Sequence, residues 1–98
     1  MLINWSKYAH ADILETLTYF ASIEDRETGQ EIVDKLFAST NILESFPFSG
    51  KQGRIEGTRE LVIPKLPYIL IYRIISSDVV EIARVFHTSK SFPGSLTE

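Results

Sequence analysis

A histidine flanked by two cations near the end of the chain is the pattern in this sequence that most directly suggests chemistry. His87 has Arg84 three positions before it and Lys90 three positions after it. A histidine titrates near neutral pH and can act as a general acid or base, while neighbouring cations can hold a phosphate group. The three residues are therefore candidates for proton transfer beside a bound phosphate. The alternative is that His87 is an ordinary polar surface group at the end of a strand.

Charge is distributed unevenly along the chain, which has a net charge of −3. Residues 1–50 carry three basic and eight acidic side chains, whereas residues 51–98 carry seven basic and five acidic ones. Such a split can place a cationic surface on an acidic protein and so suit a polyanionic or acidic partner. Arg59 could face a ligand together with Arg73 and Arg84, or it could pair with an acidic group on a neighbouring strand. A simpler alternative is that all these cations are solvent-exposed side chains at the edges of a sheet.

Several classes of function are disfavoured by what the sequence lacks. With no cysteine, disulfides and thiolate chemistry are excluded. The two histidines, His10 and His87, lie far apart and the carboxylates are scattered, so we expect neither a metal site nor a cofactor. No apolar run approaches the roughly 20 residues that span a bilayer, and residues 1–5 do not resemble a signal peptide. We therefore expect a cytoplasmic protein that does not enter a membrane.

The first half of the chain predicts a short strand followed by two helices. Residues 2–5 read as a strand, and Ser6 is a plausible N-cap for a helix over residues 7–23, where apolar residues follow helical spacing. After a polar break, Thr28 with Glu31 fits a capping box that opens a second helix, which Pro47 ends. Two consecutive amphipathic helices with a short connection predict an antiparallel hairpin.

The second half predicts three strands. A loop over residues 48–54 precedes strands at 58–63, 68–75 and 79–87, and the middle strand is so apolar that it should be central and buried on both faces. The helical hairpin is the element that can cover this sheet, so we expect a single α+β domain over residues 1–98 with the order β-α-α-β-β-β. The sheet is expected to be four-stranded and mainly antiparallel. The aromatic residues expected in the core are Trp5, Phe37, Phe46, Tyr68 and Tyr72.

Five segments in this order resemble the RelE/ParE superfamily of bacterial toxins across nearly the whole chain. They are Ile3-Asn4-Trp5-Ser6 with Ala9 and Asp12, Leu43 to Pro47, Gly57 to Leu61, Pro67 to Arg73, and Val85 to Lys90. The resemblance implies the same α+β fold and the toxin half of a type II toxin–antitoxin pair. It also implies a hetero-oligomer with a cognate antitoxin, a segment of which should cover the helical hairpin or an exposed sheet edge.

The superfamily contains two activities, and the residues leave both open. Our main hypothesis is a RelE-like endoribonuclease that cuts mRNA on the ribosome. The alternative is a ParE-like inhibitor of DNA gyrase with no hydrolytic site. Two departures weigh on the first: Ile69 stands where strongly active ribonucleases of the family have an arginine, and the chain is acidic overall. On the ribonuclease hypothesis the catalytic candidates are His87, Arg84 and Arg59, and the RNA- or phosphate-binding candidates are Lys51, Arg54, Arg73 and Lys90.

Overall fold

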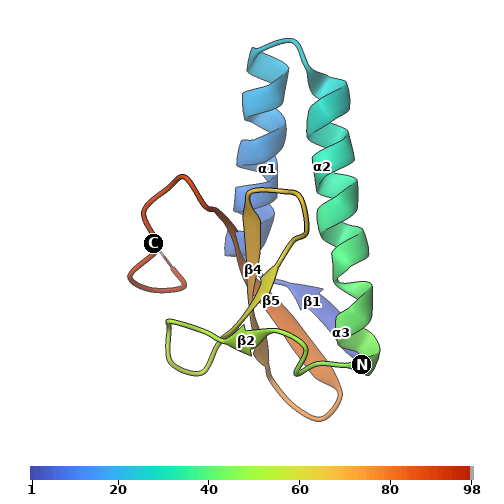
Figure 1. Ribbon diagram of the computed structural model, residues 1–98, viewed down its shortest axis with the longest axis vertical. Coiled ribbons are helices and arrows are strands. Elements are labelled where there is room, and N and C mark those ends of the chain that lie inside the picture. Colours follow the sequence, from blue (N-terminus) through green and yellow to red (C-terminus); the bar gives the residue numbers. More distant parts are fainter. Residues whose placement is uncertain (98) are drawn as a thin grey trace.

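The computed structural model describes residues 1–97, which form a helical hairpin packed on one face of a sheet (Figure 1). This confirms the predicted α+β class. Because the hairpin projects beyond the sheet, the molecule is elongated, with extents of 42 × 27 × 24 Å. The elements in chain order are β1 (Leu2–Trp5), α1 (Lys7–Ser22), α2 (Arg26–Ser39), α3 (Asn41–Ser45), β2 (Lys51–Gln52), β3 (Arg59–Val62), β4 (Tyr68–Ile74) and β5 (Val79–His87).

The sheet has five strands in the order β1-β5-β4-β3-β2, so the prediction of four strands was wrong. The missed strand, β2, lies within the predicted loop, where Lys51 and Gln52 pair with Glu60 and Arg59 of β3. A two-residue strand between glycines has no alternation of its own, and only its partner defines it. The pairs β2–β3, β3–β4 and β4–β5 are antiparallel, and β1 and β5 are parallel.

Side-chain caps set the starts of the two long helices. The Oγ atom of Ser6 accepts a hydrogen bond from the Ala9 amide at 3.0 Å, which confirms the predicted N-cap of α1. In α2 the cap is Asp25, whose Oδ1 accepts from the Thr28 amide at 3.3 Å, so the expected capping box at Thr28 was wrong. An aspartate satisfies the same free amides as a threonine, and it lies three residues earlier.

The second predicted helix is interrupted at Thr40, which separates α2 from the short α3. The Thr40 hydroxyl donates to the carbonyl of Phe37 at 2.7 Å, and α3 then ends at Ser45, before Pro47. Threonine side chains that bond back to the preceding turn bend helices. None of the helices within residues 1–97 is both long enough and apolar enough to cross a bilayer.

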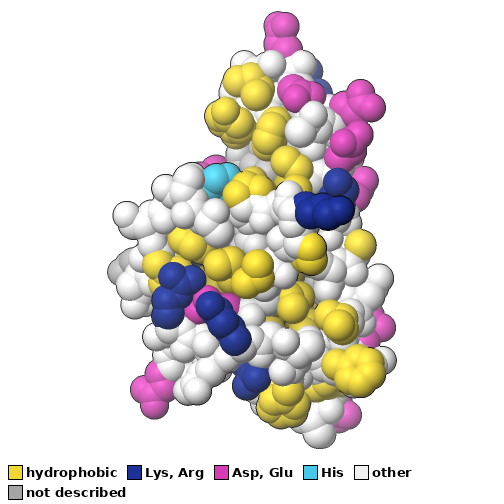
Figure 2. Space-filling model, viewed as in Figure 1, with side chains coloured by type: hydrophobic (Ala, Val, Ile, Leu, Met, Phe, Trp, Pro, Cys, Tyr) yellow, Lys and Arg dark blue, Asp and Glu magenta, His cyan; other side chains and the backbone are white. Residues whose placement is uncertain are grey.

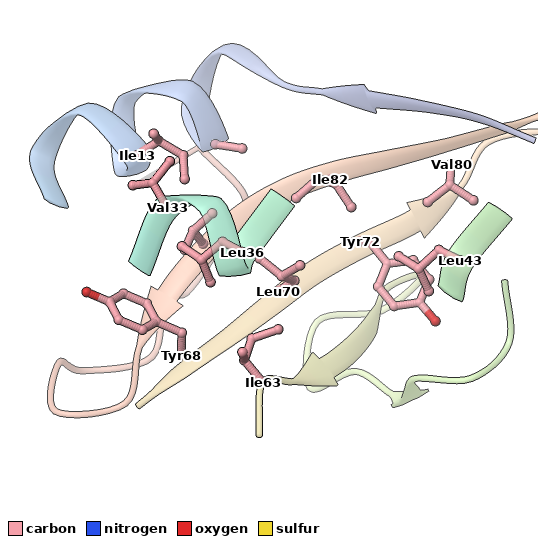
Figure 3. Packing of buried hydrophobic residues seen from close by; sticks show 12 residues of the cluster. Ile13, Val33, Leu36, Leu43, Ile63, Tyr68, Leu70, Tyr72, Val80 and Ile82 are labelled. Atoms are coloured by element: carbon pink, nitrogen blue, oxygen red, sulfur yellow. The ribbon is translucent and has the colours of Figure 1, made fainter. Parts of the chain in front are cut away.

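The main core lies between the helical hairpin and the sheet (Figure 3). Leu36 of α2 points toward Leu70 of β4, and Val33 of α2 lies beside Ile13 of α1. The opposite face of the sheet carries a smaller cluster, formed by Ile69, Ile71 and Phe86 with Phe92 and Leu96 of the C-terminal segment packed against it. The central strand β4 is therefore buried on both faces, as its apolar sequence predicted.

The expected aromatic core is confirmed only in part. Tyr68 and Tyr72 are buried, and Trp5 is partly buried against Phe37, with ring centroids 4.6 Å apart. Phe37 itself remains 42% exposed, and Phe46 is 65% exposed. The prediction for Phe46 was wrong: α3 ends at Ser45, and the Phe46 side chain that follows it stays exposed.

Candidate functional site

His87 lies at the end of β5, in a groove of about 370 Å³ between α1 and the sheet. Its ring packs edge-on against Tyr68, the opposite residue on β4, at a centroid distance of 4.9 Å. The Nδ1 atom of His87 accepts from the Ser89 amide at 3.1 Å and lies 2.7 Å from the Ser89 hydroxyl. An Nδ1 atom that accepts from an amide leaves the proton of the neutral ring on Nε2. His87 is thus held in one orientation by its own strand end.

The charges around this groove are mixed and do not form a cationic patch. Lys90 lies at the groove and pairs with Glu15 of α1, and Asp12 also lines it. A phosphate bound beside His87 would therefore meet two carboxylates as well as one lysine. On the face drawn in Figure 2, acidic side chains gather along the helical hairpin, and basic side chains lie both over the lower part of the hairpin and around β2.

Arg84 is held in an ion pair with Asp12 of α1. Its Nε lies 2.8 Å from one carboxylate oxygen and a terminal nitrogen lies 3.0 Å from the other, while the Val85 amide donates to the same carboxylate at 2.9 Å. Both charged side chains are mostly buried. The arrangement arises because β1 ends at Trp5, opposite Ile82, and α1 then covers the remaining edge of β5.

Arg59 lies on β3, which is separated from β5 by β4. Its Nε donates to the carbonyl of Gly50 at 2.9 Å, and a terminal nitrogen donates to the carbonyl of Phe48 at 3.2 Å. In the sheet Arg59 is opposite Tyr72, whereas His87 is opposite Tyr68 at the other end of β4. The structure therefore does not bring Arg59 into one constellation with His87 and Arg84.

Arg54 binds a buried glutamate on the face of the sheet opposite the helices. The Glu60 carboxylate is fully buried and accepts from the Arg54 guanidinium at 2.9 and 3.3 Å and from the Arg54 amide at 2.8 Å. Burial alone raises the pKa of Glu60, but the hydrogen bonds and charge of Arg54 outweigh it, so this pKa lies below its ordinary value. The guanidinium also stacks on Phe92, 3.6 Å from the ring centroid, and so fastens the C-terminal segment.

The two remaining candidates, Arg73 and Lys51, also lie on strands. Arg73 pairs with Glu81 across β4 and β5, where the two residues are directly opposite. Lys51 is exposed on β2, opposite Glu60, and its charge contributes to the lowered pKa of that carboxyl group. Within residues 1–97, no group of three or more acidic or histidine side chains could hold a metal ion.

Sequence reasoning missed a tightly bonded loop between α3 and β2. The hydroxyl of the buried Tyr72 donates to the carbonyl of Pro47 at 2.7 Å and accepts from the Gly50 amide at 2.9 Å. Together with the two hydrogen bonds from Arg59, these contacts attach the loop to the sheet. The only signal in the sequence for this loop was the presence of Arg59 and Tyr72 on two neighbouring strands. The strand register that places them opposite each other cannot be read from their spacing.

A helical hairpin packed on one face of a mixed five-stranded sheet agrees with the RelE/ParE-like fold that the sequence resemblance implied. A family model described as "ParE toxin of type II toxin-antitoxin system, parDE" matches residues 3–92. The chain therefore belongs to the ParE toxin family, which confirms the superfamily resemblance.

Two known proteins agree with this assignment. A Sinorhizobium fredii protein named "Putative toxin Y4kP" is 35% identical over 91 residues, covering 93% of this chain and 92% of that protein. A solved structure described as "Chromosomal ParDE TA system from P. aeruginosa" matches with a TM-score of 0.79 at 18% identity, covering 89% of this chain and 95% of the other. The main hypothesis of a RelE-like ribonuclease is not confirmed by these matches, which fit the ParE alternative better.

Proposed function

We propose that this protein is a growth-inhibiting toxin that acts on DNA gyrase through a protein–protein surface and does not cut mRNA. Membership of the ParE family supports this. The observation that carries it is that four of the six cationic site candidates are each paired with a carboxylate. These pairs are Arg84 with Asp12, Arg54 with Glu60, Arg73 with Glu81, and Lys90 with Glu15.

Paired cations are poorly suited to RNA cleavage. Stabilising the charge that develops on a phosphate requires donors that are already oriented toward it and not compensated by another anion. Here a phosphate would have to displace a carboxylate from Arg84 or Arg54, and the displaced Asp12 or Glu60 would remain nearby as a repelling charge. A surface that recognises another protein has no such requirement.

The proposal includes a cognate antitoxin that binds the toxin and neutralises it in a hetero-oligomer, within the cytoplasm where gyrase works. The matching family and the P. aeruginosa structure are both described as parts of a toxin–antitoxin system, which supports this partner. The groove beside α1 offers a concave surface with apolar walls, including Tyr19, Phe20 and Val85, where a segment of such a partner would fit. The gene beside the toxin gene is the first place to look for the antitoxin.

Replacing His87 with alanine tests the proposal directly. We expect the variant to inhibit gyrase supercoiling and bacterial growth within about twofold of the wild type, because no proton transfer is required of it. The measurement is a titration of purified toxin into a supercoiling assay, together with viable counts after induced expression. His10→Ala, a histidine on α1 outside the groove, is the control for general effects of removing an imidazole.

The same proteins should be added to a translating extract and the message mapped for cuts. Cleavage within codons by the wild type that disappears in His87→Ala would overturn the proposal and restore the ribonuclease hypothesis. Failure of the wild type to affect supercoiling, with growth still inhibited, would leave the toxin assignment standing and exclude gyrase as its target.

A further inference from the structure

Two exposed phenylalanines project from the loop that joins α3 to β2. Phe46 is 65% exposed and Phe48 is 68% exposed, the highest values among the large hydrophobic side chains that the structure leaves exposed. We call residues 46–50, which carry both rings, the aromatic loop. Figure 2 shows exposed hydrophobic side chains at the lower end of the molecule, where α3 and the segment after it lie in Figure 1. Aromatic side chains of this kind dominate the energetics of protein interfaces.

The aromatic loop is rigid although it has no regular secondary structure. The Tyr72 hydroxyl and the Arg59 guanidinium make four hydrogen bonds to backbone atoms of Pro47, Phe48 and Gly50, at 2.7 to 3.2 Å. Gly50 is buried so closely that a β-carbon there would lie 2.7 Å from the Glu60 carbonyl oxygen and from the Tyr72 ring. The two side chains that bond to the loop, Arg59 and Tyr72, both belong to strands of the sheet.

A rigid loop that displays aromatic rings is already in its binding conformation. Ordering a flexible loop opposes association, so a loop that is fixed beforehand binds more tightly for the same contacts. A protein that hid its apolar side chains for stability alone would bury Phe46 and Phe48, as it buries Tyr68 and Tyr72. The hydrogen bonds instead attach the loop backbone at Pro47, Phe48 and Gly50 to the sheet, while both rings stay exposed.

Two cations, Arg59 and Lys51, lie on the Phe48 side of the loop, while Glu44 of α3 precedes Phe46. The Arg59 guanidinium lies over the Phe48 ring, 5.2 Å from its centroid, and Lys51 follows the loop in β2. Among residues 1–97, no carboxylate lies within ion-pair distance of either cation. Among the described residues, Arg59 and Lys51 are the two cationic site candidates for which no ion pair is found. They complement a partner surface that is apolar at its centre and acidic at its rim.

We propose that the aromatic loop is the surface by which this toxin engages the protein it inhibits, with Phe46 and Phe48 inserted into an apolar pocket whose rim carries carboxylates. This inference rests on the proposed function in that it assumes a protein target. The two candidate surfaces, the aromatic loop and the groove at His87, differ in shape, and this difference indicates which one binds the target and which one binds the antitoxin. A projecting rigid loop enters a pocket of a folded partner, whereas the groove at His87, near the other end of β4, accepts a segment of chain.

The decisive variant is Phe46→Ala with Phe48→Ala. We expect its half-inhibitory concentration in the supercoiling assay to rise at least about 30-fold, since aromatic anchors at interface centres carry most of the affinity. Affinity for the antitoxin should stay within about threefold. The matched control is Leu14→Ala with Ile23→Ala, which removes two similarly exposed apolar side chains from α1 and its C-terminal end and should leave inhibition unchanged.

A second variant separates rigidity from contact area. Tyr72→Phe keeps both exposed rings but removes the hydroxyl that anchors the loop to the sheet, and we expect inhibition to weaken by about 3- to 10-fold. Amide hydrogen exchange at Gly50 should quicken in the same variant. A urea denaturation curve for each variant establishes that the chain is folded.

Unchanged inhibition by the double phenylalanine variant would overturn the inference. A loss of antitoxin binding with inhibition intact would also overturn it and assign the loop to the antitoxin. If the wild type does not inhibit gyrase, the proposed target fails separately, and growth inhibition by the same variants then tests the loop. Full growth inhibition without the two rings would contradict it whatever the target is.

Discussion

Replacing Asp12 with alanine should lower the free energy of unfolding by about 3 kcal/mol. The Asp12 carboxylate accepts hydrogen bonds from the Arg84 guanidinium and the Val85 amide, and both charged side chains are mostly buried. Without Asp12, the Arg84 guanidinium and the Val85 amide lose this carboxylate in a region that water reaches poorly, and the lost hydrogen bonds lower the free energy of unfolding. The free energy of unfolding of a small domain is about 5 to 15 kcal/mol, so the variant would lose a large fraction of it. Urea unfolding at neutral pH measures the change.

A neighbouring ion pair supplies the matched control. Glu15 lies on the same helix and pairs with Lys90, but both side chains are mostly exposed, so Glu15→Ala should change the free energy of unfolding by no more than about 0.5 kcal/mol. In a double-mutant cycle with Arg84→Ala, the changes in the free energy of unfolding caused by the two substitutions should not be additive. Equal effects of Asp12→Ala and Glu15→Ala would contradict the structural role assigned to Asp12.

The second large effect is expected at Glu60. Glu60→Gln keeps the size of the side chain but removes the charge that Arg54 binds through its guanidinium and amide. We expect the free energy of unfolding at neutral pH to fall by about 2 kcal/mol, since hydrogen bonds to charged groups are among the stronger ones. Because the Arg54 side chain is about half exposed, part of the lost interaction is recovered from water, which keeps the expected loss below that for Asp12.

The effect of Glu60 should depend on pH in a defined direction. The pKa of Glu60 is lowered in the folded chain, so the unfolded state binds this proton more readily than the folded state does. Its contribution is therefore complete above the ordinary pKa of a glutamate and is lost as the pH falls through the lowered folded value. The gap between wild type and Glu60→Gln in urea unfolding should shrink over that acidic range.

Glu81→Gln is the matched control for the loss at neutral pH, because Glu81 also pairs with an arginine across two strands but is more exposed. Its gap from the wild type at neutral pH should be smaller than that of Glu60→Gln, since solvent screens a partly exposed ion pair. A Glu60→Gln gap that stayed constant from neutral to acidic pH would show that the carboxylate contributes through packing and not through its charge.

Local patterns in the sequence were sufficient for the elements that carry their own signal. The strand at Val79–His87, the cap at Ser6 and the doubly buried β4 each follow from residues within one segment. The break at Thr40 and the strand at Lys51–Gln52 could not be found this way. The first depends on a side chain that bonds back into its own helix, and the second on pairing with β3.

The candidate site depended on contacts between distant segments, which explains why sequence reasoning reached it only in part. Residue type and spacing identify Arg84 as a cation and His87 as a proton carrier, but Asp12, the partner of Arg84, lies 72 positions earlier, where no spacing pattern connects the two. Glu60 lies only six positions after Arg54, but their pairing depends on the chain reversal between β2 and β3, which sequence reasoning did not predict. Spacing identifies charged residues, and the fold decides which of them neutralise one another.

The parallel pairing of β1 with β5 affects how the chain reaches its native state. The β4–β5 hairpin closes through a short turn, whereas Leu2 must find Val79 across most of the chain, and such distant pairings slow folding. We expect the hairpin to form early and the N-terminal strand to dock last. Trp5 is partly buried only after that docking, so its fluorescence should report the final step of refolding in a stopped-flow experiment.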